Sequence, residues 1–149
     1  MSDYSDFLNE MGQHKYEPAA ADRPLRAEDL EDGIYVARIT TIAPRRVESL
    51  GGWCWDWTVV IKSGPGHVGR AMTYGTLLTS EYSKNRLGLE LERLGLKAES
   101  FSALLNLAME MLPKQTIEFK KSTTVSKQGK TYHNIDAQSV VGGDPALPF

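Results

Sequence analysis

The chain has 149 residues, of which 41% are hydrophobic and 24% charged, and its formal net charge at pH 7 is −2. A chain of this size typically forms one domain with its own hydrophobic core, which excludes a second full domain. Cys54 is the single cysteine and the histidines lie far apart in the sequence, so we expect no disulfide, no metal site and no cofactor. The acidic start and the short uncharged stretches predict a cytoplasmic protein without a secretory leader or membrane span.

Charge is distributed unevenly along the chain. Residues 1–32 contain nine acidic and three basic side chains, a net charge of −6, whereas residues 33–143 contain fourteen basic and nine acidic side chains, a net charge of +5. We expect an acidic, weakly ordered leader with at most a short helix at 1–32, a folded domain at 33–141 and a flexible tail at 142–149. The basic body indicates a polyanionic partner, and we expect the acidic leader to compete with that partner for the body; an ordinary solvated surface is the alternative.

Three extended segments open the folded domain. Branched and aromatic residues predict a strand over residues 34–42, ended by Pro44. The strongest alternation in the chain then predicts a strand over 53–61, and a third extended run covers 70–78 after a glycine-rich turn.

A helical segment and two more strands follow. Leucines at helical spacing predict one helix that starts at Thr79 or Ser80 and stops at Gly95, and a second that starts near Ser100 and is closed by Pro113. The last two strands are predicted over 116–125 and 131–141, joined by a short glycine-containing loop that is typical of a hairpin.

The order of these elements predicts a mainly β fold with helices. Five strands with one helical insertion between the third and fourth are typical of a five-stranded, OB-type barrel. That fold binds oligonucleotides on its second and third strands and on the loops between strands one and two and strands four and five. The β-forming parts, residues 33–79 and 113–141, carry ten basic and four acidic side chains. We therefore expect a groove that follows a phosphate backbone.

The candidate contacts are cations, which neutralise phosphates, and aromatic rings, on which bases stack. They are Arg45, Arg46, Trp53, Trp55, Arg70, Tyr74, Lys120, Lys121, Lys127, Lys130 and Tyr132. Trp53, Trp55 and Trp57 share a face that is by default the core side, and we expect Trp57 to point inward and Trp53 to lie at the rim. Phe119 is expected in the core, Tyr74 and Tyr132 fit either role, and Lys120 and Lys121 are alternatively a solvated strand edge.

Catalytic motifs are missing from the sequence. The string Gly64–Gly69 fits G-x-G-x-x-G, but no predicted helix follows it and Pro65 lacks an amide, so it does not predict a dinucleotide site. Glu81, Glu90 and Glu92 are expected on the solvated face of a helix, without the clustered ligands of a metal nuclease. We therefore predict a protein that is not an enzyme, with a small nuclease as a rival hypothesis.

Four segments resemble a known family. They are Asp32–Val36, Gly69–Tyr74, Leu94–Leu96 and Gly129–Ile135. Together they make the chain similar to phage-encoded single-stranded-DNA-binding proteins with an OB-fold. The resemblance implies sequence-independent binding of single-stranded DNA during phage DNA replication or recombination, in the cytoplasm of the bacterial host. It leaves open whether the chain forms a homo-oligomer.

The C-terminal residues are similar to the tip of bacterial single-strand-binding proteins, which end in acidic residues, proline and phenylalanine. This chain ends with a single acid followed by Pro-Ala-Leu-Pro-Phe. The resemblance implies that Asp144, Leu147, Pro148 and Phe149 dock on replication or recombination proteins; an unstructured end is the alternative. The rival function is a non-catalytic phage protein-interaction or assembly module that uses this tail.

Overall fold

The computed structural model describes residues 2–13 and 24–142, and its folded part is mainly β, as predicted. Five antiparallel strands form one sheet in the order β3-β2-β1-β4-β5. The strands are β1 (Gly33–Val47), β2 (Gly52–Ser63), β3 (Ala71–Leu77), β4 (Thr116–Val125) and β5 (Thr131–Gly142). All five lie where the sequence predicts extended chain.

β1 is the central strand and is shared by both halves of the sheet. Its residues 33–38 pair with β4, while residues 36–47 pair with β2. The predicted strand ended before Pro44, but β1 continues to Val47. Beyond Ile39 the strand pairs only with β2, and an edge position of this kind tolerates a residue without an N–H.

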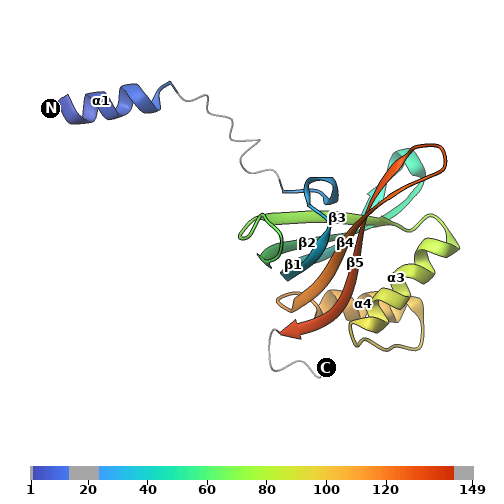
Figure 1. Cartoon of the computed structure of the whole chain (residues 1–149). Coiled ribbons are helices and arrows are strands. Elements are labelled where there is room, and N and C mark those ends of the chain that lie inside the picture. Colours follow the sequence, from blue (N-terminus) through green and yellow to red (C-terminus); the bar gives the residue numbers. More distant parts are fainter. Residues whose placement is uncertain (1, 14–23, 143–149) are drawn as a thin grey trace.

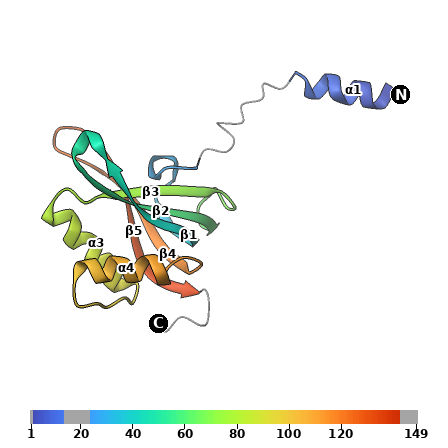
Figure 2. The same ribbon diagram turned by 180° about the vertical axis from the view of Figure 1, so that it is seen from behind.

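The ladder does not close into a cylinder. Among the described residues, β3 and β5 are the two edge strands and no backbone pairing joins them. The β1–β2 and β4–β5 hairpins extend toward the same end of the molecule, with β4–β5 nearer the viewer in Figure 1 and β1–β2 nearer in Figure 2. The sheet curls enough for α3 to contact both edge strands, while a seam stays open between β3 and β5.

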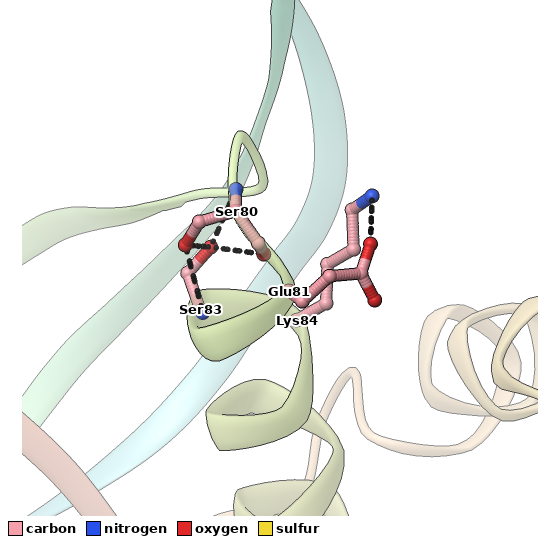
Figure 3. Close-up of polar contacts among 4 residues, drawn as sticks. All are labelled: Ser80, Glu81, Ser83 and Lys84. Atoms are coloured by element: carbon pink, nitrogen blue, oxygen red, sulfur yellow. Dashed lines mark hydrogen bonds and ion pairs between the residues drawn. The ribbon is translucent and has the colours of Figure 1, made fainter.

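Two helices, α3 (Glu81–Arg93) and α4 (Phe101–Met111), connect β3 to β4 and lie together at one end of the sheet (Figure 1). Ser80 caps α3 as predicted: its Oγ accepts a 3.1 Å hydrogen bond from the Ser83 N–H, and Ser83 Oγ donates to the Ser80 carbonyl at 3.0 Å (Figure 3). Gly95, in the left-handed region at φ 96°, follows the end of α3, also as predicted.

The core lies between the sheet and the two helices. Trp57 stacks on Tyr74 with 5.7 Å between ring centroids, and Tyr35 stacks on Phe119 at 5.1 Å. The inward positions predicted for Trp57 and Phe119 are confirmed, since both side chains are fully buried.

The residues just before β1 belong to the folded body. Leu25 pairs with Met72 of β3 as an isolated bridge, and both Leu25 and Leu30 are buried in the core. The short helix η1 (Ala27–Asp29) contacts both β3 and β5. Residues 24–32 are thus part of the domain rather than of a weakly ordered leader. The reason is that Leu25 and Leu30 bury their side chains in the core.

The acidic segment also contains a regular helix, α1 (Ser2–Met11), which lies apart from the sheet (Figure 1). This agrees with the short helix expected there. In the part of the chain that the structure describes, every helix is too short or too polar to cross a bilayer.

Candidate nucleic-acid interface

A groove with a volume of about 1160 Å³ occupies the seam between β3 and β5. One wall is formed by residues 73–77 of β3 and the opposite wall by residues 131–135 of β5. Residues of α3 between Tyr82 and Glu90, the segment 24–28, Arg45 of β1 and Asp56 of β2 contribute the remaining lining. The groove exists because the two edge strands are held apart by η1 and α3 instead of pairing with each other.

Each of the two hairpin tips beside the groove carries a cation over an aromatic ring. On the β1–β2 tip, the Arg46 guanidinium carbon lies 5.6 Å from the ring centroid of Trp53, its direct partner across the ladder. On the β4–β5 tip, the Lys130 Nζ lies 5.2 Å from the ring centroid of Tyr132. The rings are 47% and 45% exposed. We call these four residues the rim; they offer charge and open ring surface together.

Two further arginines are held at the groove by carboxylates. Arg45 Nε donates a 2.7 Å hydrogen bond to Asp56, and Arg86 donates a 2.6 Å bond to Asp136, which joins α3 to β5. These bonds raise the pKa of both guanidinium groups. A guanidinium has five N–H donors, so each arginine keeps donors for an anion in the groove.

Asp56 has a second partner, the buried thiol of Cys54, which donates to its other carboxylate oxygen at 3.1 Å. Burial raises the pKa of Cys54 to about 11, so the thiol stays protonated at neutral pH. Cys54 therefore orients the carboxylate that holds Arg45.

The floor of the groove includes Tyr74 and Glu90, which are both buried. The Tyr74 hydroxyl makes no hydrogen bond to the described residues, and burial raises its pKa well above the ordinary value. Glu90 accepts a 3.0 Å hydrogen bond from the backbone N–H of Ala137, and burial raises its pKa to about 7. The prediction that Glu90 lies on a solvated helix face is wrong, because its carboxylate satisfies a backbone donor of the edge strand β5.

Several predicted contacts are brought together at this groove. Arg45, Tyr74 and Tyr132 line it, although the ring of Tyr74 is covered by its neighbours. Arg46, Trp53 and Lys130 lie at the rim. Lys127 is exposed in the turn between β4 and β5, three residues before Lys130. Trp53 thus occupies the rim position expected for it.

Two predicted contacts are buried instead. Trp55 is 1% exposed, so its ring offers no face to a base. Lys121 is 2% exposed, and its Nζ donates to Asp32 Oδ1 at 3.0 Å and to Thr123 Oγ1 at 2.8 Å. Asp32 also accepts a hydrogen bond from Thr123, and the bonds from Thr123 and Lys121 lower its pKa. Lys121 therefore has a structural partner and no free ammonium for a phosphate.

Two others are exposed but lie outside the groove. Arg70 precedes β3, whereas the groove uses residues 73–77 at the other end of that strand. Lys120 is exposed on β4, beside Ile34 of β1, and is not part of the lining. The proposed partner-docking residues Asp144, Leu147, Pro148 and Phe149 lie outside the described residues.

The groove also contains side chains that the sequence did not single out. They are Arg26, Tyr82, Arg86, His133 and Asn134. Tyr82 and Arg86 are four residues apart on the exposed side of α3, and this spacing of an aromatic residue and a cation was the available signal. A scan against protein-family models and a search of curated proteins found no match to this chain.

Proposed function

We propose that this protein binds single-stranded DNA without preference for base sequence and without catalysing a reaction. The observation that carries this proposal is the pair of rim cations lying over exposed rings on the two hairpins that line one groove. Arg46 and Lys130 would neutralise phosphates while bases stack on Trp53 and Tyr132. Every base has a flat face, so such contacts tolerate any sequence.

The arrangement of the sheet supports the same proposal. We propose that the sheet is an OB-type barrel left open between β3 and β5, since its strand order places β1 at the centre and the helical insertion between β3 and β4. OB-folds bind oligonucleotides through the loops between strands one and two and strands four and five. Those loops are the two hairpin tips that carry the rim.

The electrostatic contribution follows from the accessible cations. Arg45, Arg46, Lys127 and Lys130 are exposed at the tips, and four phosphate contacts predict that log K falls with log salt at a slope of about −3 for a single strand. The role in phage DNA replication or recombination implied by the resemblance is part of this proposal.

A fluorescence titration with oligo-dT at two salt concentrations tests the proposal. Trp53 is the exposed tryptophan, so its emission should change on binding while Trp55 and Trp57 remain shielded. We expect saturable binding that weakens as salt increases, similar affinity for a mixed-sequence oligonucleotide, and weaker binding of a duplex. The Trp53→Phe variant should bind with little change in emission. Absence of binding, or an affinity that does not depend on salt, would contradict the proposal.

A further inference from the structure

Helix α1 presents an apolar face that nothing in the described structure covers. Tyr4, Phe7, Leu8 and Met11 recur at the spacing of one helix face, and each side chain is more than half exposed. The helix segment contains three acidic and no basic residues. A ten-residue helix is marginal in water by itself, so an exposed apolar face of this kind is typical of a segment that docks in a groove.

The chain enters the body beside the groove described above. Pro24 and Arg26 line that groove, and twelve residues separate Met11 from Pro24. Twelve residues span at most about 40 Å when extended, and a ten-residue helix is about 15 Å long. α1 can therefore reach the groove of its own chain, and a tether of this length gives millimolar effective concentrations.

The surfaces of the groove and of α1 are complementary. Leu77, Tyr82 and Tyr132 are exposed on three different walls and offer apolar surface to the face of α1. The cations of the hairpin tips lie around them, opposite in sign to the acidic flank of the helix. An acidic amphipathic helix thus matches the same combination of charge and rings that we assign to DNA.

We propose that α1 docks in the groove of its own chain through Tyr4, Phe7, Leu8 and Met11, and that it competes there with single-stranded DNA. The competition rests on the proposed function, whereas docking of α1 does not require DNA. The helix would act as an internal competitor that a long single strand displaces. Docking on a second copy is the alternative, and the position of the tether at the groove of the same chain favours the internal contact.

Docking is tested on the full chain without DNA by paramagnetic relaxation. A spin label on a Ser5→Cys variant reacts selectively because native Cys54 is buried, and Ser5 lies off the apolar face. We expect broadening of the amide signals of Tyr132, His133 and Tyr82, which disappears when Phe7→Ser and Leu8→Ser are added. Absence of broadening overturns the inference. The same broadening in a mixture where the spin label and the isotope label are on different chains would assign the contact to a second copy and overturn the inference too.

Competition is tested separately with labelled oligo-dT. The apparent affinity scales with the fraction of undocked groove, so docking of half to nine tenths of the molecules predicts that F7S/L8S binds about 2- to 10-fold more tightly. The matched control Asn9→Ser lies on the polar side of α1 and should bind as the unmodified chain does. Unchanged affinity of F7S/L8S would overturn the competition. Absence of oligonucleotide binding by every variant would instead refute the proposed function, and the relaxation experiment would still decide whether α1 docks.

Discussion

The rim of the groove and the layer buried beneath it contain the same kinds of residue in opposite environments. Trp53 is 47% exposed at the tip of β2, while Trp55, two residues further along the same strand, is 1% exposed. Lys130 lies over an aromatic ring at the rim, while Lys121 is buried against Asp32. Residue type and strand position alone therefore do not separate an accessible side chain from a buried one.

The difference between these two layers has a testable consequence. Rim side chains contact few neighbours, so their replacement should change DNA affinity and leave the free energy of unfolding nearly unchanged. Buried side chains should show the reverse behaviour. The substitutions below compare the two layers, from the largest expected effect to the smallest.

Trp55→Ala should lower the free energy of unfolding by about 3 to 5 kcal/mol, because it leaves a large cavity in a fully buried position. Urea denaturation measures this loss. At low temperature, where the variant remains folded, its affinity for oligo-dT per folded molecule should equal that of the unmodified chain. A loss below about 1 kcal/mol would show that Trp55 is not a core residue.

Glu90 should make stability depend on pH. Its pKa is raised from 4.5 to about 7 by burial, so the folded state binds this proton more tightly than the unfolded state does. The resulting stabilisation, about 3 kcal/mol, is fully present below pH 4.5 and is lost as pH rises through about 7.

Urea midpoints between pH 4.5 and 8 test this effect. Glu90→Gln keeps an oxygen for the Ala137 N–H and removes the titration, so its midpoint should change much less across this range. Glu92→Gln, on the exposed side of the same helix, is the matched control and should keep the pH dependence. If the urea midpoint changes equally with pH in Glu90→Gln and in the unmodified chain, Glu90 is not the group responsible for the pH dependence.

Trp53→Ala should weaken oligo-dT binding by about 1 to 3 kcal/mol, because one base loses its stacking surface. Fluorescence anisotropy of a labelled oligonucleotide measures the change. Trp53→Phe retains a flat ring and should lose less affinity. If Trp53→Ala instead reduces the free energy of unfolding as strongly as Trp55→Ala does, the rim and the buried layer are not distinct.

Arg46→Ala combined with Lys130→Ala should reduce the salt dependence of binding. Each lost phosphate contact changes the log-log slope by about 0.7 for a single strand, so the double variant should lose about 1.4. Arg70→Ala removes an exposed cation outside the groove and should leave the slope unchanged. Equal slopes for the double variant and the unmodified chain would show that DNA does not contact the rim.

Much of the secondary structure was predictable from local patterns. The tryptophan alternation placed β2, serine caps marked the start of α3, and the glycine-containing loop Ser126–Lys130 marked the last hairpin. These signals act over a few residues and need no knowledge of the fold. Pro44 misled the prediction of β1, because a proline breaks a strand only where neighbours on both sides need its N–H.

Half of the candidate site was predictable for the same reason. Residues at or beside a hairpin turn are exposed wherever the turn lies, so Arg46 and Lys130 were identifiable as accessible cations from the hairpin pattern. Alternation assigns a side chain to a face of the sheet but says nothing about how deeply that face is covered. Trp55 and Lys121 were therefore misassigned, since other elements cover them.

The sequence by itself determined the order of strands and helices, the caps and turns that bound them, and the basic character of the β-forming parts. Only the tertiary structure decided that β3 and β5 stay apart to form a groove, and that Arg86 and Asp136, fifty residues apart, join across it at 2.6 Å. The physical reason is that hydrogen-bonding and hydrophobic periodicities are local, whereas burial and the pairing of charges depend on which distant segments meet.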